Sequence, residues 1–440
     1  MPYCLNFSFL IIFVRTDKSH NLFTMRSKII FFGLFFLFSI SLFARGLEWK
    51  VHSFFGLQIF PSYSWSMVYI SQETYNEAGN YFGDNAGQVG VNIRKLKKGQ
   101  KIRVEFAANE IMEKTVLNFT PEKDYDTPFF LYPQVMYKWS VLERWVQPKP
   151  VNLKISVYVD GVLDDSRSVR IVVRSVYDCP YFVASDLGLS IGVSYVFLSY
   201  VNQNHPLITD KILPEIMNEN ILKSIVGYQE TSNGNYSSIY RQVYAVWHYL
   251  SQNKLYYSSL QNKFSEDRLP YSMTQYVRPF SEIFASRQAS SYDSTILFAS
   301  ILERMGIATY LMLTPERCYL GFALDEAGTT IFYLDTSSMG TALNQFNEED
   351  KEYIQNFELT DSDEEFRSKS NNSSTYNEFI AALFLGTLEY QNNQSKFRTN
   401  PSDMVFTSDS DEIKQAYDTF SYTILSVRHY RKVGLISMNL

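Results

Sequence analysis

Alternating apolar and polar positions dominate the chain from residue 47 to about residue 177, and this period of two predicts β-strands. The clearest case is the segment from Val151 to Val176. Apolar residues alternate with other residues before and after Asp160-Gly161, a pair typical of the two-residue turn in a β-hairpin: Leu153, Ile155, Val157 and Val159 on the first strand, and Val169, Ile171 and Val173 on the return. The segment from Val89 to Asn109 alternates in the same way and predicts a second pair of strands. Several short strands separated by turns favour an immunoglobulin-like β-sandwich, which we expect to act as a spacer or recognition module.

The period changes to that of helices after about Ser194. Between Ser238 and Leu250 the main apolar residues recur at spacings of three or four, which places them on one helix face. Pro214 must start or kink an earlier helix. Ser291 to Met305 predicts a helix that Gly306 ends, and apolar strand segments follow at 307–313, 318–324 and 331–334. The predicted fold class is therefore α+β.

The first 46 residues carry a targeting signal rather than a fold. Arg26 and Lys28 precede an apolar run from Ile29 to Ala44. This run is short for a membrane span, which needs about 20 residues, and it matches the layout of a secretory signal peptide. We expect an exported protein that is periplasmic, associated with the outer envelope or secreted, with no transmembrane segment after cleavage. Because residues 1–24 contain another apolar stretch, Met25 is the expected start, and an uncleaved anchor is the alternative.

Polar and charged residues dominate residues 348–376, which we interpret as a linker. Residues 377–440 contain a short helical segment and an apolar end, and we expect this C-terminal segment to dock on the preceding domain. The predicted organisation is a signal peptide at 1–46, a β-sandwich at 47–177, a mixed domain at 178–347, the linker and the C-terminal segment.

Composition and charge exclude several classes of function. The chain has 46 acidic and 40 basic residues, a formal net charge of -6, and we find no basic tract, so we expect no nucleic-acid partner. Only Cys179 and Cys318 follow the signal segment, which is no disulfide framework, and whether they pair stays open. No Cys/His group has the spacing of metal ligands, so we predict no metal site and no cofactor. We expect most of the 32 Tyr and 34 Phe in the core, with an aromatic binding platform as the alternative.

A helix with a nucleophile in its first turn, followed by two strands that carry a base and an acid, is the layout of papain-like and transglutaminase-like enzymes. Residues 197–340 resemble a bacterial transglutaminase-like domain. The stretches that carry the resemblance are, in chain order, SYVNQNHP, VWHYLSQNKLYYSS, TQYVRP, QASSYDSTILFASILERMGI, TPERCYLGFALD and FYLDTSSMG. VRSVYDCPY resembles the stretch before this domain in a secreted subgroup that has an N-terminal β-module. The resemblance implies a papain-like α+β fold with a triad of Cys, His and a carboxylate.

Two of the three triad positions depart from the family pattern. The family motif Q-A-N-C-x-D corresponds to residues 288–293, where Ser291 stands at the position of the Cys. The motif P-G-H corresponds to residues 315–317, where Arg317 stands at the position of the His. The carboxylate is kept as Asp335. Since arginine cannot act as a base with a pKa above about 12, we predict a catalytically silent domain in which Arg317 forms an ion pair with Asp335.

Strand alternation assigns the neighbours of Arg317 to two faces. Arg317 and Tyr319 share one face, while Cys318, Leu320 and Phe322 share an apolar face that should meet the core. We therefore interpret Cys318 as a buried structural residue rather than a relocated nucleophile. The non-catalytic interpretation of Ser291 is a helix N-cap, a role that Asp293 can fill equally well.

The function that we expect is binding of a peptide, a protein or a cell-envelope component in the former substrate cleft. Its expected walls are Arg317 and the side chains of Trp247, Tyr276, Tyr292, Asp293 and Tyr319. One alternative is an active hydrolase or acyltransferase that uses Ser291, or Cys318 activated by Arg317, because a neighbouring cation favours a thiolate. The other is a structural envelope protein that acts through its β-module.

Overall fold

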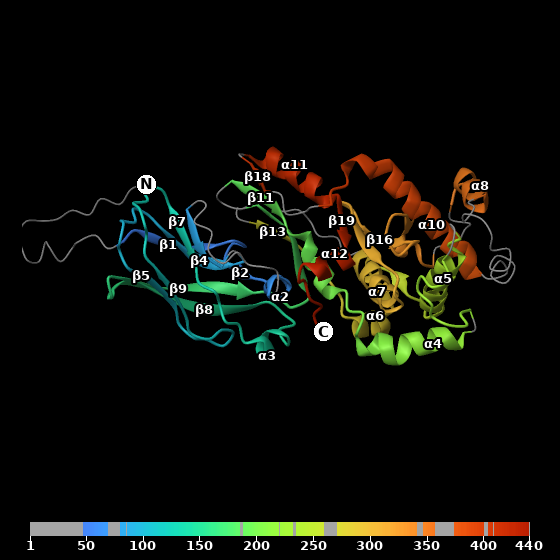
Figure 1. The fold of residues 1–440 in the computed structure, drawn as a ribbon, viewed down its shortest axis with the longest axis horizontal. Coiled ribbons are helices and arrows are strands. Elements are labelled where there is room, and N and C mark those ends of the chain that lie inside the picture. The colour runs from blue at the N-terminus through green and yellow to red at the C-terminus, as the bar shows by residue number, and fades with distance from the viewer. Residues whose placement is uncertain are drawn as a thin grey trace, which may run out of the picture. The chain divides into compact units, whose positions relative to one another are not determined.

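The computed structural model combines helices and strands, in agreement with the predicted α+β class (Figure 1). Trp49–Leu440 forms one compact unit. In the part of the chain that is described, no helix has the length and apolar content to cross a membrane. The predicted signal peptide at 1–46 lies outside the described residues, which are 47–68, 80–84, 86–184, 188–219, 221–231, 235–258, 271–340, 346–356, 374–399, 404–407 and 409–439.

The first part of this unit contains two sheets, with strand orders β1–β4–β7–β3 and β2–β9–β8–β5–β6. The strands are β1 (Trp49–Ser53), β2 (Gln58–Ile59), β3 (Tyr81–Gly83), β4 (Val89–Ile93), β5 (Ile102–Phe106), β6 (Thr115–Phe119), β7 (Phe129–Tyr132), β8 (Lys149–Val159) and β9 (Val162–Val173). Two short helices, α2 (Pro61–Met67) and α3 (Trp139–Leu142), accompany them.

The two strands predicted between Val89 and Asn109 exist as β4 and β5, but the prediction that they pair with each other is wrong. β4 pairs with β1 and β7, while β5 pairs with β6 and β8 in the other sheet. Between them the buried Leu96 forms a bridge to Tyr125, so the connection passes from one sheet to the other instead of turning back.

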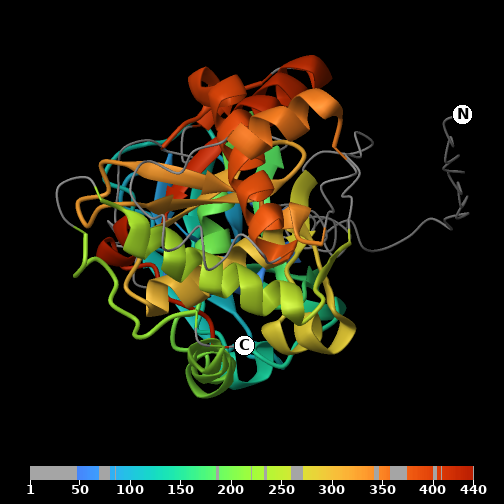
Figure 2. The same cartoon turned by 90° about the vertical axis from the view of Figure 1, so that its right-hand side faces the viewer.

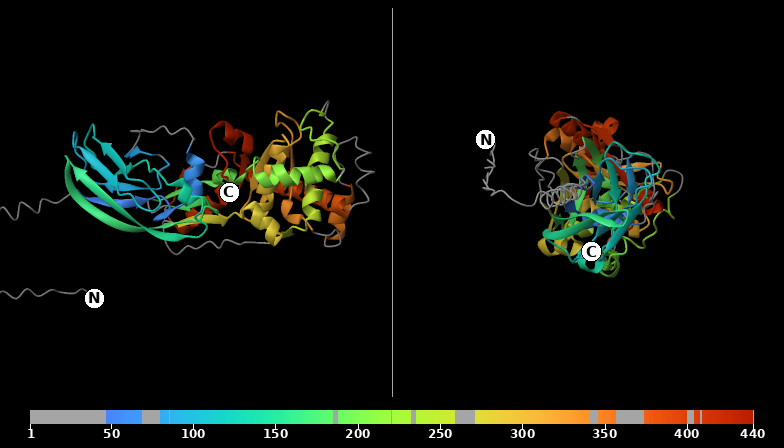
Figure 3. Two further views of the ribbon diagram at one scale, coloured as in Figure 1. Left: turned by 90° about the horizontal axis from the view of Figure 1, so that it is seen from below. Right: turned by 90° about the vertical axis from the view of Figure 1, so that its left-hand side faces the viewer.

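The predicted hairpin is formed by β8 and β9, the long paired strands in Figure 3. Asp160 and Gly161 have φ angles of 50° and 85°. Positive φ at both central residues is what a type I′ turn requires, and the Asp-Gly pair tolerates it. The predicted alternation appears on β8 as a row of buried side chains: Val151, Leu153, Ile155 and Val157.

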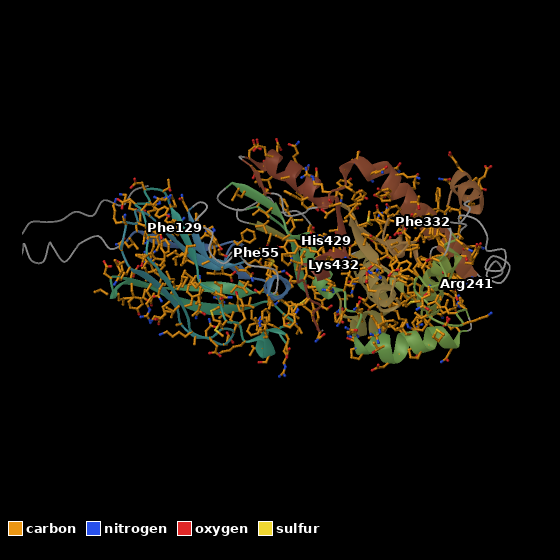
Figure 4. All side chains as sticks on the ribbon, in the orientation of Figure 1. Phe55, Phe129, Arg241, Phe332, His429 and Lys432 are labelled. Carbon is orange, nitrogen blue, oxygen red and sulfur yellow. The ribbon has the colours of Figure 1, made fainter. Side chains whose placement is uncertain are left out.

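Aromatic side chains connect the two sheets. The ring of Phe119 on β6 stacks on Phe129 of β7 with centroids 4.9 Å apart, and it lies 4.6 Å from the ring of Phe82 on β3. Phe129, labelled in Figure 4, is completely buried. On the β1 side, Arg167 of β9 lies 4.1 Å from the centre of the Trp49 ring and donates a hydrogen bond to the Trp49 carbonyl. The apolar faces of both sheets are thus covered.

Two further four-stranded sheets follow, with orders β13–β10–β11–β18 and β17–β16–β15–β19. Their strands are β10 (Asp178–Ala184), β11 (Leu189–Gly192), β13 (Tyr271–Tyr276), β15 (Thr309–Leu313), β16 (Cys318–Ala323), β17 (Ile331–Leu334), β18 (Met404–Phe406) and β19 (Thr423–Ser426). A short parallel pair joins β12 (Tyr256–Tyr257) and β14 (Gln288–Ala289). The helical segments are η1 (Ser194–Tyr200), η2 (Leu207–Ile212), α4 (Leu213–Asn218), α5 (Ser237–Gln252), α6 (Phe280–Ser286), α7 (Ser291–Arg304), η3 (Thr336–Ser338), α8 (Glu348–Asn356), α10 (Ser374–Asn393), η5 (Gln394–Lys396), α11 (Ser410–Ser421) and α12 (Val427–Lys432).

Helix α7 follows the sequence prediction closely. Gly306 has a φ of 84°, and the N–H of Ile307 donates to the Leu302 carbonyl at 2.9 Å. This pattern closes the helix as the predicted C-terminal glycine should. Pro214 is the second residue of α4, which directly continues the π-helical segment η2, so it marks a junction within a continuous helical stretch.

The C-terminal part of the chain completes the sheet that carries Cys318. β19 pairs antiparallel with β15, and α10 lies beside β17 and α5 (Figure 2). Within the predicted linker, Glu348–Asn356 is the helix α8 and residues 357–373 lie outside the described part. One apolar core gathers residues far apart in sequence, from Phe55 through Phe298 to Met438.

Candidate functional site

The head of α7 is fixed by a capping box rather than by Ser291. Ser290 is the N-cap, and its Oγ accepts a hydrogen bond from the Asp293 N–H at 3.2 Å. The Asp293 carboxylate accepts in return from the Ser290 N–H at 2.8 Å. A capping box joins residues three positions apart. The capping partner of Asp293 is therefore Ser290 and not Ser291. The interpretation of Ser291 as the N-cap is therefore wrong by one residue, and Ser291 is the first residue of the helix.

The side chain of Ser291 points at the start of β16. Its Oγ accepts a hydrogen bond from the Cys318 N–H at 3.2 Å, and the residue is 4% exposed. One helical turn on, Thr336 Oγ1 lies 2.8 Å from Ser294 Oγ and 2.9 Å from Thr295 Oγ1. These hydroxyl contacts hold α7 against β16 and η3. The segments 288–293 and 315–319 therefore meet in space.

Arg317 forms the predicted ion pair with Asp335. Its Nη1 lies 2.8 Å from Asp335 Oδ2, which confirms this pairing. A second carboxylate, which the sequence did not predict, takes the other terminal nitrogen: Arg317 Nη2 lies 3.0 Å from Glu389 Oε2. The side chain of Arg317 is 35% exposed, while that of Asp335 is 5% exposed. Arg317 is thus held between one carboxylate of the sheet and one of α10.

Asp335 is anchored by several groups besides Arg317. Its Oδ1 accepts from the N–H and the hydroxyl of Ser337, at 2.9 and 2.5 Å. Its own N–H donates to the Ala382 carbonyl of α10 at 3.0 Å. The carboxylate therefore caps η3 and receives a cation at the same time.

Helix α10 brings Glu389 to the site because it packs against the backbone of β17. A Cβ atom on Gly386 would stand 2.7 Å from Leu334 N and 2.8 Å from Tyr333 C, so only glycine allows this approach. One turn later the Tyr390 ring stacks on Tyr333, with centroids 4.1 Å apart. The sequence indicated Glu389 only as part of a predicted helical segment from Glu378 to Tyr390. No sequence motif links that segment to Arg317.

Both faces of β16 are buried. Cys318, Leu320 and Phe322 face the core beside α7, as predicted. Tyr319, on the face of Arg317, is also buried, and it packs with Tyr333 and Phe397. Burial raises the pKa of the Cys318 thiol far above its usual value. Cys318 and Cys179 are both buried and free, which answers the question of their pairing: they form no disulfide.

The residues expected to line a cleft are mostly interior. Trp247 is completely buried between Phe298 and Phe379, and Tyr292 stacks on Phe197 at 4.8 Å. Asp293 is fully buried and pairs with Arg278 Nη1 at 2.7 Å. Tyr276 is half-buried and donates to Glu282 at 3.0 Å. With Tyr319 also in the interior, the expected set does not gather around one open cleft.

An open hollow lies instead beside Pro315, in the same loop as Arg317. Its volume is about 590 Å³. We call it the Pro315 hollow, and it is lined by Pro315, Ser395, Lys396, Phe397, Arg398, Gln415, Asp418, Thr419 and Tyr422. Lys396 Nζ lies 4.8 Å from the Tyr422 ring, and Arg398 lies 5.9 Å from the Phe420 ring. The hollow thus combines two cations and one carboxylate with aromatic surface.

The described part of the chain offers no base to Ser291. The hydroxyl of Ser291 accepts a hydrogen bond from the backbone N–H of Cys318. The described histidines contact other groups: His248 bonds Thr375, His205 accepts from the Leu207 N–H, and His52 and His429 pack on Phe130 and Tyr430. Within the same residues, no group of three or more His, Cys, Asp or Glu side chains is placed to hold a metal ion.

Comparison with known proteins gives no match for this chain among protein-family models, curated proteins or solved structures. The transglutaminase-like resemblance therefore rests on the sequence motifs, and the interpretation of the site rests on its own geometry.

Proposed function

We propose that this chain is an exported, non-catalytic transglutaminase-like protein with an N-terminal β-sandwich, and that it binds a peptide, protein or cell-envelope component. One observation carries the non-catalytic part. Arg317, at the position of the family's base, is bound by Asp335 at 2.8 Å and by Glu389 at 3.0 Å.

This arrangement supports a structural role because it provides no base that could activate Ser291 as a nucleophile. A serine needs a base to take its proton, and an arginine held by two carboxylates cannot accept one. The hydroxyl of Ser291 instead accepts a hydrogen bond from the Cys318 N–H. The degenerate triad then serves to hold the helix α7, the sheet and the helix α10 together.

The alternative of a relocated Cys nucleophile has less support. A reactive cysteine needs an exposed and electropositive setting in which the thiolate is stable. Cys318 is completely buried, its side chain faces away from Arg317 toward the core, and burial raises its pKa. Each of these properties favours the inert thiol.

For the binding part of the proposal, the Pro315 hollow is a better candidate than the expected cleft, because it is open and lined by polar and aromatic groups. Lys396 and Arg398 suit a carboxylate, and the rings of Phe397 and Tyr422 suit an apolar or sugar surface. Asp418 offsets one of the two positive charges. A ligand with one carboxylate beside a ring or an apolar group matches these walls.

The experiment has a catalytic arm and a binding arm. The full chain and its Ser291→Ala variant are assayed for amide and ester hydrolysis and for incorporation of a fluorescent amine into casein. We expect equal background rates, and turnover that Ser291→Ala abolishes would overturn the non-catalytic part.

The binding arm titrates the full chain with N-acetylmuramic acid and with a pool of acidic tripeptides. We expect saturable binding that Lys396→Glu weakens and that Lys432→Glu, an equal charge change at an exposed position on α12, leaves unchanged. Binding to neither probe, or equal loss in both variants, would count against the Pro315 hollow as the site.

A further inference from the structure

The segment 435–439, which follows helix α12, belongs to no helix or strand, and side chains from distant parts of the fold hold its backbone. The indole N–H of Trp65 on α2 donates to the Ser437 carbonyl at 3.1 Å. The side-chain amide of Asn202 donates to the Met438 carbonyl, also at 3.1 Å. In peptide recognition, hydrogen bonds to the main chain supply affinity for an extended segment. The fold therefore holds this segment in the way that a protein holds a bound peptide.

The backbone of η1 and the residue after it faces the same segment. The Met438 N–H donates to the Ser199 carbonyl at 2.7 Å, and the Ser437 hydroxyl donates to the Val201 carbonyl at 2.9 Å. The guanidinium of Arg431 donates to both of these last two residues, at 2.5 Å to the Val201 carbonyl and at 2.8 Å to Ser437 Oγ. We call this site the tail groove, and its polar groups come from Trp65, Ser199, Val201, Asn202 and Arg431.

Two apolar side chains of the segment are anchored, and they stand three positions apart. Leu435 is 1% exposed and Met438 is 4% exposed, while the two residues between them are half-buried. Met438 borders a cavity of about 20 Å³ whose lining includes Tyr200, Phe280 and Ile296. A space of this size holds about one water molecule, so the pocket is not completely filled. The tail groove thus combines main-chain recognition with pockets for two apolar side chains.

The attachment of the segment allows it to leave the groove. Gly434 precedes it with a φ of 102°, a conformation that glycine adopts without strain and at which the chain can change direction. Lys432 and Val433 before it are exposed, and Asn439 at its other side is exposed too. A short segment held by a few contacts belongs to those parts of a fold that open locally before the whole protein unfolds.

We propose that the tail groove is a peptide-binding site that the segment 435–439 occupies as an autoinhibitory contact. The partner that replaces it is an extended protein segment with two apolar side chains three positions apart, because the seated segment shows which main-chain groups and which side chains the groove accepts. A tethered occupant competes at a high effective concentration, so the groove is closed to weak ligands. This site is separate from the Pro315 hollow and does not depend on it.

The test supplies the segment as a free peptide. A fluorescein-labelled, amidated peptide VGLISMNL, the sequence of residues 433–440, is titrated into the full chain and into its Met438→Asp variant, with anisotropy as the readout. The parent should bind it weakly, since its groove is occupied. The variant should bind it at least about tenfold more tightly, because an aspartate in the apolar pocket releases the tethered occupant. The peptide VGLISDNL should bind neither protein.

Matched variants locate this binding. Added to Met438→Asp, Trp65→Phe keeps an aromatic ring but removes the donor to the Ser437 carbonyl, and it should weaken the peptide by about threefold to tenfold. Trp139→Phe, the same change on the ring 5.2 Å from that of Trp65, should leave the affinity unchanged. Met136→Asp, at a methionine that is 66% exposed, should leave the peptide affinity at the value of the parent.

Hydrogen exchange of the unaltered chain tests the release without a variant. The peptic fragment that covers residues 433–440 should exchange at least about a hundredfold faster than the fragment with β16, because it opens locally. Equal exchange in both fragments would mean that the segment opens only with the whole fold, and the proposal would be refuted. A Met438→Asp protein that keeps its circular dichroism spectrum and binds no peptide would refute it as well. So would one that loses its fold, since the segment would then be part of the core.

Discussion

The guanidinium of Arg317 lies 2.8 Å from the carboxylate of Asp335, and it bridges this residue of the sheet to Glu389 of α10 at 3.0 Å. In the antiparallel register of β16 and β17, Leu320 pairs with Leu334, which makes Arg317 a diagonal neighbour of Asp335. An arginine spans that diagonal and still reaches a third element. Arg317 is therefore a structural connection between the sheet and helix α10.

Removing this connection should destabilise the fold. Arg317→Ala leaves Asp335, whose side chain is 5% exposed, without its cation. Because the arginine itself is partly exposed, we expect a loss of about 1–2 kcal/mol in the free energy of unfolding, below the cost of breaking a fully buried pair. Urea unfolding measures it. Glu389→Gln, which keeps the shape and a hydrogen-bond acceptor, should lose less, and an Arg317→Ala protein as stable as the parent would show that the ion pair contributes nothing.

Cys318 should react slowly with thiol reagents in the native protein. Its thiol is buried and its pKa is raised by burial, so at pH 8 almost none of it is thiolate, the reactive form. Iodoacetamide labelling, located by mass spectrometry, should be faster by orders of magnitude in denaturant than in native buffer. Stoichiometric labelling of Cys318 in the folded chain would instead support the alternative of an active enzyme.

The features that the sequence predicted correctly are those that neighbouring residues determine. The Asp160-Gly161 turn specifies its hairpin, and Gly306 specifies the end of α7, because positive φ at these positions is a local requirement. The pairing of β4 with β5 was wrong because strand partners are chosen by distant residues, here those of β1, β7, β6 and β8.

In the candidate site too, the features set by neighbouring residues were predictable from the sequence, and those set by distant packing were not. The predicted ion pair of Arg317 and Asp335 is present, while the hydroxyl of Ser291 contacts the backbone N–H of Cys318. Glu389 and the burial of Tyr319 could not be predicted, because both depend on where α10 and the segment after it pack. Trp247 was expected in a cleft, yet an aromatic residue on the apolar face of a helix is compatible with a wall or with the core, and the packing of Phe298 and Phe379 decides for the core.

The stability of the fold should fall as the pH drops below about 6.5, the usual pKa of a histidine, in part because of His248. Burial lowers the pKa of this imidazole, whose Nδ1 lies 2.7 Å from Thr375 Oγ1. Its folded pKa is then below the unfolded value of about 6.5. The unfolded chain therefore takes up a proton first as the pH falls, and the native state loses stability. Thermal melts across this range should show a smaller pH effect in His248→Gln than in the parent, while His429→Gln, on an exposed residue, should behave like the parent.

Gly386→Ala has two opposing effects on stability: it raises helix propensity, but it crowds the packing against β17. We expect the packing effect to be the larger. In an unconstrained helix this change stabilises by roughly 0.5–1 kcal/mol. Here the new Cβ would meet Leu334 N at 2.7 Å and Tyr333 C at 2.8 Å, which are backbone atoms that cannot move aside as a side chain can. We therefore expect a net loss of about 1–3 kcal/mol, as in other overpacked sites, together with a displaced α10 and a weaker contact between Glu389 and Arg317. Urea unfolding measures the loss, and Gln391→Ala, at an exposed position of the same helix, should change stability by less than about 0.5 kcal/mol. A more stable Gly386→Ala protein would mean that α10 does not approach β17 as closely as the structure has it, and the position of Glu389 beside Arg317 would then need another explanation.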